Sequence, residues 1–122
     1  MKIRHLEKAD FDQCIDLLQA FAHEIGDDTL IETHRDFSQI KRILVLCLCS
    51  GTSWVAEDEG LIAGMLLSFR EPDLWRRNYL RIRELAWFVR PDYRKGSVAG
   101  RLFRAYQKSC EELHQQLSLI HI

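Results

Sequence analysis

Apolar residues alternate with polar residues over short runs of this chain, and over longer runs they recur every three to four residues. Alternation predicts β-strands, and the longer spacing predicts amphipathic helices. Asp58–Gly60 joins two strands in a hairpin, and Arg70–Asn78 is a loop before the last strand. The predicted strands are Lys2–Leu6, Ser53–Glu57, Leu61–Phe69 and Tyr79–Val89. The predicted helices run from Asp10 to a break at Gly26–Asp28, from about Thr33 to Gly51, and from about Val98 to Gln115. The pattern predicts the order β-α-α-β-β-β-α in one α+β domain.

The last predicted helix carries a continuous apolar face. The residues expected to face the core are Val98, Leu102, Phe103, Tyr106, Cys110 and Leu113. Two further cysteines, Cys14 and Cys47, also occupy apolar helix positions, and no C-x-x-C or H-E-x-x-H spacing occurs. We therefore interpret these cysteines as reduced, buried thiols and predict no metal ligands.

Charge and hydropathy narrow the classes of partner. Lysine and arginine number 17 against 18 acidic residues, and the chain has no basic tail, so we predict no nucleic-acid partner. The apolar run Ile43–Cys49 is too short to cross a bilayer, and no signal peptide is evident. These features predict a cytoplasmic protein that has no membrane partner.

The segment from Glu84 to Cys110 has the layout of an anion-binding site. It reads as a strand ended by Pro91, then a short basic turn with glycine, then a helix. Backbone N–H groups at the open start of a helix carry its positive dipole end, and phosphate binds there readily. Arg94 and Lys95 add positive charge, and small residues such as Gly96 let a phosphate approach the backbone. A phosphate-bearing ligand is the expected occupant; a plain connection between strand and helix is the alternative that the turn taken alone leaves open.

The same residues resemble the acetyl-CoA motif of the GCN5-related N-acetyltransferase (GNAT) superfamily. In that family the motif reads V-x-P-x-Y-R, followed by [QR]-x-x-G-x-[GA]. Here Val89–Arg94 is followed by Lys95–Ala99, with Arg94 at the first position and Ala99 at the last. Ser97 stands where the middle glycine is usual. A variant of phage and environmental members, with E-L-A-W-W-V before the proline, is closer still.

The resemblance implies a GNAT-like fold with a mixed, mainly antiparallel sheet and acetyl-CoA as co-substrate. It implies that backbone groups of the last strand bind the pantetheine arm, and that an N–H at about Trp87 or Phe88 holds the oxyanion. The side chains of these two aromatics are expected in the core or covering a sheet face. The implied cofactor-binding residues are Trp87, Phe88, Val89, Arg94, Lys95, Gly96, Ser97, Val98 and Ala99.

Glu84 is the candidate general base, because the resemblance places it on the strand where many members carry an acidic residue that acts through water. An ion pair with Arg83 or Arg70 on a solvated sheet face is the alternative. Tyr106 is expected in the core rather than at the site.

The family's acceptor site corresponds to segments His23–Arg35 and Arg70–Tyr79. The second segment combines tryptophan with arginines, which would suit an acidic or aromatic partner; a solvated loop with Trp75 tucked against the sheet is the alternative.

The family continues beyond this helix with further strands and a helix, so the resemblance implies a C-terminally truncated domain over 1–116. Residues 117–122, LSLIHI, look like the translation of a transposase-end sequencing adaptor, which predicts an artefactual tail. A genuine short strand is the alternative.

The predicted function is transfer of an acetyl group from acetyl-CoA to an amine of a small molecule or protein by direct attack, with a second copy of the chain as a candidate partner. One alternative is a non-catalytic acyl-CoA-binding or interaction module. Another is an α/β protein that binds a different phosphate ligand, such as a nucleotide.

Overall fold

The computed structural model describes residues 1–33, 35–116 and 120–121, which form one sheet and four α-helices. The strands are β1 (Lys2–His5), β2 (Trp54–Asp58), β3 (Leu61–Pro72), β4 (Leu80–Val89) and β5 (Ile120–His121). The helices are α1 (Phe11–Ile25), α2 (Asp28–Thr33), α3 (Phe37–Ser50) and α4 (Val98–Gln116), and the short 3-10 helices η1 (Lys8–Asp10) and η2 (Pro91–Tyr93) precede α1 and α4. The predicted element order is present, with α2 and β5 added.

Helix α2 lies in a segment that was expected only to separate two longer helices. The Asp27 side chain accepts the Leu30 N–H at 3.1 Å, and the Asp27 carbonyl accepts the Ile31 N–H at 2.9 Å. An aspartate that satisfies the first free N–H groups in this way is a common helix start. The break at Gly26 is therefore short, and a separate helical turn follows it.

The sheet has the strand order β1-β2-β3-β4-β5. Strands β1 to β4 pair antiparallel, whereas β5 pairs parallel with Leu80 and Arg81 at the start of β4. The predicted mixed, mainly antiparallel sheet is confirmed. The predicted tail over 117–122 lies outside the described residues, apart from the two residues of β5. From Ile82 to Val89 the outer edge of β4 pairs with no strand in the described part of the chain.

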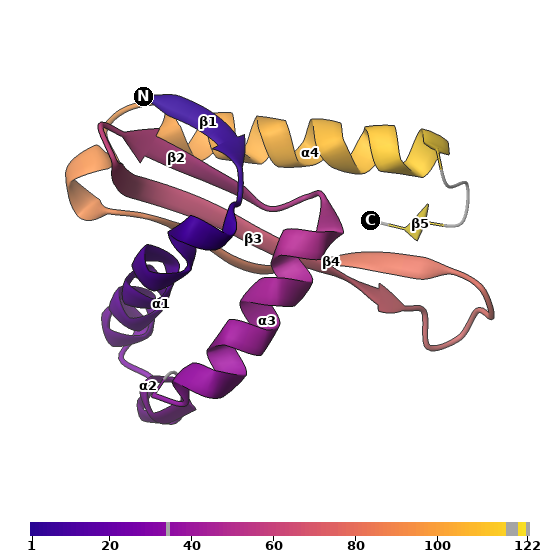
Figure 1. The fold of residues 1–122 in the computed structure, drawn as a ribbon, viewed down its shortest axis with the longest axis horizontal. Helices are drawn as coiled ribbons and strands as arrows, with labels where there is room; N and C mark the ends of the chain where they lie inside the picture. The colour runs from indigo at the N-terminus through magenta and orange to yellow at the C-terminus, as the bar shows by residue number, and fades with distance from the viewer. Residues whose placement is uncertain (34, 117–119, 122) are drawn as a thin grey trace.

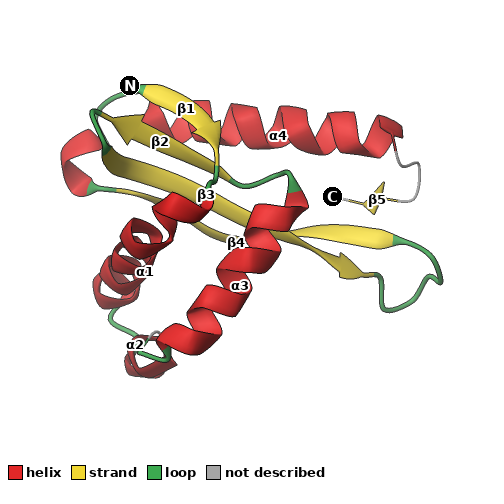
Figure 2. Ribbon diagram, viewed as in Figure 1, coloured by secondary structure: helices red, strands yellow, loops and turns green. Residues whose placement is uncertain are grey.

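Helices cover both faces of the sheet, with α1 and α3 on one face and α4 on the other (Figures 1 and 2). β3 is buried on both faces from Ile62 to Ser68, as expected for a central strand that lies between two helical layers. Leu17 of α1 and Leu44 of α3 are fully buried in one core, and Leu102 of α4 is fully buried in the other.

Two aromatic side chains lie elsewhere than the sequence suggests. The prediction that Phe103 faces the core is wrong, because its side chain is 43% exposed and stacks on Trp87, with ring centroids 5.3 Å apart. Both rings lie where β4 has no outer neighbour. Trp75 in the β3–β4 loop is 88% exposed, so it is not tucked against the sheet.

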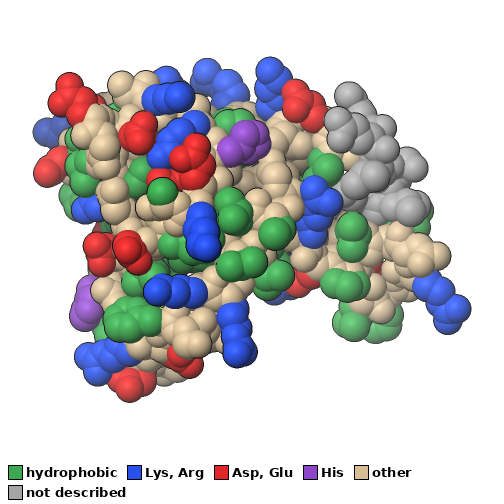
Figure 3. All heavy atoms as spheres, viewed as in Figure 1, with side chains coloured by type: hydrophobic (Ala, Val, Ile, Leu, Met, Phe, Trp, Pro, Cys, Tyr) green, Lys and Arg blue, Asp and Glu red, His purple; other side chains and the backbone are tan. Residues whose placement is uncertain are grey.

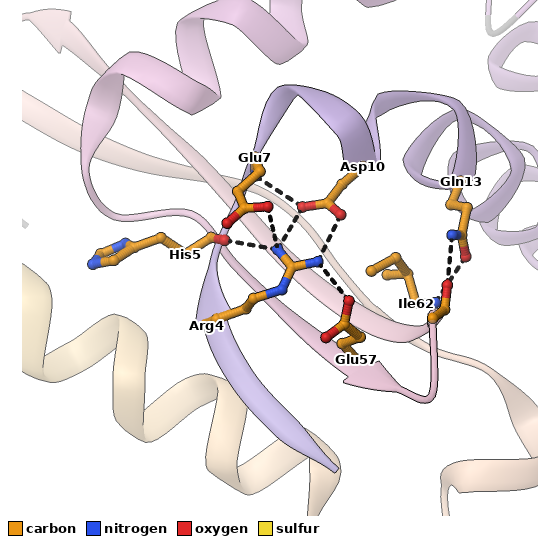
Figure 4. Close-up of polar contacts among 8 residues, drawn as sticks. Arg4, His5, Glu7, Asp10, Gln13, Glu57 and Ile62 are labelled. Carbon is orange, nitrogen blue, oxygen red and sulfur yellow. Dashed lines mark hydrogen bonds and ion pairs between the residues drawn. The ribbon is translucent and has the colours of Figure 1, made fainter.

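A buried ion pair fastens the start of α1 to the sheet (Figure 4). Both terminal guanidinium nitrogens of Arg4 donate to the Asp10 carboxylate at 2.8 Å, and one of them also donates to Glu57 of β2 at 3.2 Å. Asp10 additionally accepts the Glu7 N–H at 2.8 Å. Farther along α1, Gln13 pairs its side-chain amide with the β2–β3 hairpin, accepting the Ile62 N–H at 2.7 Å. These contacts fix α1 relative to the sheet on which the site is built.

Candidate active site

A β-bulge interrupts β4 directly after Glu84. Leu67 of β3 lies opposite Ala86, while the next residue, Ser68, lies opposite Glu84, so Leu85 is the extra residue. A bulge bends its strand and disrupts the ladder locally. The bulge therefore separates Glu84 from the last part of β4.

Beyond the bulge, alternate backbone groups of β4 face the unpaired edge. The Arg90 N–H donates to the Ala63 carbonyl at 2.8 Å. Because hydrogen-bonded positions alternate along an antiparallel pair, Phe88 and Ala86 also direct their N–H and C=O groups toward β3. Trp87 and Val89 therefore direct their N–H and C=O groups outward. Of these two aromatic residues, Trp87 therefore has an N–H that faces outward, whereas Phe88 uses its N–H in the ladder.

The turn before α4 leaves a row of backbone donors open. In the described structure, no N–H bond from residues 95–99 to a protein acceptor is present, and the helical ladder begins with the Arg101 N–H donating to the Ser97 carbonyl at 2.9 Å. Gly96 is exposed, and a Cβ built on it meets no atom within 4 Å. The turn thus presents free N–H groups beside open space, which is the arrangement that an anion requires.

Polar contacts to the β2–β3 hairpin hold this turn in place. The Tyr93 hydroxyl donates to Asp58 at 2.7 Å, and this bond, with some burial, raises the pKa of the tyrosine. The Arg90 side chain donates to the Ile62 carbonyl at 2.8 Å. The strand end and the start of α4 are therefore tied to the rigid centre of the sheet. Gly64 allows the close approach, because a Cβ there would lie 3.1 Å from Val89 and 3.2 Å from Leu102.

A pocket of about 290 Å³, which we call the β4 pocket, lies where α1, the end of β4 and the start of α4 meet. Its lining residues are Phe21, Glu24, Ile25, Trp87, Phe88, Val89, Arg94 and Ala99. Five of them, from Trp87 to Val89 with Arg94 and Ala99, are sequence-predicted site residues. Phe88 is also a core residue, packed edge-on against Phe21 with ring centroids 5.9 Å apart.

Arg94 bridges the two walls of this pocket. Its terminal nitrogens donate to the Glu24 carboxylate at 2.7 and 2.6 Å, and its Nε donates to the Val89 carbonyl at 2.9 Å. The guanidinium also lies over the Phe88 ring, 5.2 Å from its centroid. The hydrogen bond from Arg94 lowers the pKa of Glu24. Arg94 thus neutralises Glu24 and fixes the mouth of the pocket, while the backbone of the turn remains available to an anion.

Glu84 lies outside the β4 pocket, on an exposed part of β4. It makes no ion pair with a described residue, because Arg83 pairs with Glu71 at 3.1 Å and Arg70 donates to the Ser50 carbonyl at 3.0 Å. The ion pairs considered as its alternative role are therefore absent from the described structure. Tyr106, on the buried face of α4 as predicted, has its pKa raised first by burial and then by Cys110 and the charge of Glu84.

The structure divides the remaining predicted residues between backbone and side-chain roles. Lys95, Gly96 and Ser97 are exposed in the turn but do not line the pocket, and the Val98 side chain is buried against the sheet. The buried Val98 side chain is not accessible to a ligand, whereas the backbone of this residue belongs to the turn. Of the predicted acceptor segments, His23–Arg35 contributes Glu24 and Ile25 to the lining. Phe21 lines the pocket but was not predicted as a site residue, because its position on the helix is equally typical of a core residue.

Comparison with known proteins identifies the family. The sequence model of the acetyltransferase (GNAT) family matches residues 11–121, so the chain belongs to this family. Membership makes the protein an N-acetyltransferase that takes its acetyl group from acetyl-CoA. No curated protein sequence is similar enough to count as a match.

Solved structures share the fold at low identity. A GCN5-related N-acetyltransferase from Ralstonia eutropha JMP134 is 17% identical with a TM-score of 0.70, over 99% of this chain and 82% of that one. A possible acetyltransferase from Clostridium difficile 630 is 18% identical with a TM-score of 0.68, over 90% and 70%. Arabidopsis thaliana Naa50, in complex with the bisubstrate analogue CoA-Ac-MVNAL, is 10% identical with a TM-score of 0.65, over 98% and 67%. In the described part of this chain, every helix is too short or too polar to span a membrane.

Proposed function

We propose that this chain binds acetyl-CoA across the open edge of β4 and the turn before α4, and acetylates an amine at the β4 pocket. One observation carries the proposal: the β4 pocket is lined by Trp87 and Val89, whose N–H groups face away from β3, and by Ala99, the last residue of the turn whose N–H groups at 95–99 make no bond to a described protein acceptor. An extended amide chain can pair with the strand edge while its phosphates bind at the helix start.

The strand edge also supplies a donor for the reaction. When the neutral amine nitrogen attacks the thioester carbonyl, the C–N bond forms and negative charge develops on the carbonyl oxygen. The C–S bond then breaks, and coenzyme A leaves as a thiolate that takes up the proton released from the new amide nitrogen. We assign the outward N–H of Trp87 to that oxygen. One such donor is typically worth about 2.7 to 4 kcal/mol of transition-state stabilisation.

The acceptor must lose a proton before it attacks, because an alkyl amine with a pKa of about 10.4 is mostly charged at neutral pH. We assign this step to Glu84, acting through water. Its carboxylate is exposed and makes no ion pair with a described residue, so it can accept a proton. The bulge places it just before the strand edge on which the thioester is expected.

Separate titrations of the protein with coenzyme A and with ATP test the binding site. We expect calorimetry to show saturable binding of coenzyme A and much weaker binding of ATP, which lacks the pantetheine arm. Ala99→Leu should weaken coenzyme A binding by at least tenfold, because Ala99 lines the pocket at the start of α4. Tighter binding of ATP than of coenzyme A would instead favour the alternative of a nucleotide-binding protein, which the phosphate-binding turn by itself also permits.

Steady-state kinetics of Glu84→Gln separate catalysis from binding. We expect kcat to fall by about 10²-fold or more, the acidic limb of the pH profile to disappear, and acetyl-CoA affinity to change little. Glu111→Gln, an exposed carboxylate on α4, is the matched control. Wild-type kcat and pH profile in Glu84→Gln would refute the assignment, and coenzyme A binding with no transfer by the parent chain would favour a non-catalytic acyl-CoA-binding module.

Two further parts of the proposal concern the cellular compartment and the oligomeric state of the protein. All four cysteines are free, as expected in a reducing compartment such as the cytoplasm. A homodimer stays a prediction, which light scattering of the purified chain tests.

A further inference from the structure

A second hollow, which we call the β1 groove, lies on the opposite flank of α4 from the β4 pocket. It measures about 710 Å³ and separates α4 from the edge strand β1. Its lining residues are Ile3, His5, Ser50, Gly51, Trp54, Arg101, Arg104, Ala105, Lys108, Ser109, Glu112 and Leu113. No residue lines both hollows, so the β1 groove is separate from the proposed acetyl-CoA site.

One wall of the β1 groove is cationic. Arg101, Arg104 and Lys108 stand three and four positions apart, which places them on one face of α4. None of the three makes an ion pair with a described residue, and Glu112 is the single carboxylate in the lining. Figure 3 shows Lys and Arg side chains along the upper rim of the molecule, over α4. The groove therefore presents unneutralised positive charge.

The floor of the β1 groove is aromatic and fixed. His5 and Trp54 stack with ring centroids 3.9 Å apart, on neighbouring strands where they are direct partners in the register. The Trp54 indole N–H donates to the Ser109 hydroxyl at 3.1 Å, which ties the stack to α4. The shape of the floor therefore does not depend on a ligand.

The outer edge of β1 borders this floor with unpaired backbone groups. The Leu6 N–H donates to the Ser53 carbonyl at 3.0 Å, so residues 2, 4 and 6 bond toward β2, and Ile3 and His5 face outward. The His5 carbonyl already accepts from Arg4 at 3.1 Å (Figure 4). The N–H groups of Ile3 and His5 and the carbonyl of Ile3 remain for an added strand.

We infer that the β1 groove binds an acidic peptide in extended conformation, added as a strand to the outer edge of β1. Alternate side chains of such a strand lie about 6.8 Å apart. The Cα positions of Arg101, Arg104 and Lys108 are spaced about 4.5 and 6 Å along the helix axis, since a helix rises about 1.5 Å per residue. Carboxylates at every second peptide position can therefore meet these cations, while the backbone pairs with Ile3 and His5.

The first test uses a fluorescein-labelled nine-residue peptide in which glutamate alternates with threonine, titrated into the full chain and followed by anisotropy. We expect saturable binding that weakens as salt rises, because the cations are exposed. The double variant Arg104→Gln with Lys108→Gln should weaken binding by about fivefold or more. The matched control, Lys41→Gln with Arg42→Gln, removes two exposed cations from α3 on the other face of the sheet and should leave binding unchanged.

The second test distinguishes strand addition from simple charge attraction. A peptide N-methylated at alternate residues cannot donate along one edge, so it should bind at least tenfold more weakly than its parent. The parent peptide should also shift the amide NMR signals of Ile3 and His5. Equal binding of the methylated peptide, unshifted signals at β1, or equal weakening by the α3 control variant would each overturn the inference. So would competition by free glutamate as effective as that by the peptide.

Discussion

Gly96→Val should abolish tight coenzyme A binding while leaving the fold intact. Gly96 lies in the middle of the turn whose N–H groups face open space, and its backbone is not in the left-handed region that favours glycine. A Cβ built there meets no atom within 4 Å, so the free protein can accept a valine side chain. We therefore expect the free energy of unfolding to change by less than about 1 kcal/mol.

The effect on binding follows from the donors that the branched side chain would obstruct. Residues 95–99 offer five open N–H groups, and a phosphate that approaches Gly96 needs contact with the turn at van der Waals distance. A hydrogen bond to a charged group contributes about 1.5 to 3 kcal/mol. Losing two such bonds would cost about 3 to 6 kcal/mol, and every 1.4 kcal/mol is about tenfold in affinity. A loss of at least tenfold is therefore a conservative expectation.

Calorimetry with coenzyme A measures the affinity, and thermal unfolding of the unliganded variants measures the fold. Gly96→Ala provides a graded control, because a single methyl group should weaken binding less than valine does. If Gly96→Val keeps both its melting temperature and its coenzyme A affinity, the phosphates do not bind at this turn. The reasoning from the open helix start would then be wrong.

Three other expectations follow from contacts away from the turn. Asp10→Ala should destabilise the protein by about 3 kcal/mol in urea unfolding, because it removes two charge-assisted hydrogen bonds between the half-buried Arg4 and a buried carboxylate; an unchanged midpoint would contradict this. Ellman's reagent at pH 8 should rapidly label only Cys49, the exposed cysteine, since burial raises the pKa of the other thiols, that of Cys14 to about 12. Because the pKa of Glu24 is lowered by Arg94, their pairing should hold above the ordinary glutamate pKa and be lost as pH falls through the lowered value. An NMR titration of Glu24 that shows an ordinary pKa would refute the pairing.

Local sequence was sufficient for most elements of the fold. Side-chain alternation and helical spacing depend on which residues stand two, three or four positions apart, so they identify β2, β4 and α4 nearly at their observed bounds. The phosphate turn was predictable for the same reason, because a strand end at Pro91, small residues and a helix start are consecutive in the chain. The short helix α2 was not predicted, because its N-cap residue, Asp27, lies in the segment whose sequence also predicts a break between helices.

The remaining features needed the tertiary structure because they join residues far apart in the chain. The pair between Glu24 and Arg94 forms only when α1 packs beside the end of β4, and no spacing rule relates positions 70 residues apart. The bulge at Leu85 is a matter of register between two strands, which alternation alone does not fix. Phe103 fits a core-facing pattern on its helix, yet it is exposed because β4 has no outer neighbour in the described structure at Trp87, on which Phe103 stacks. Periodicity shows which face of an element is apolar, and only packing decides what that face meets.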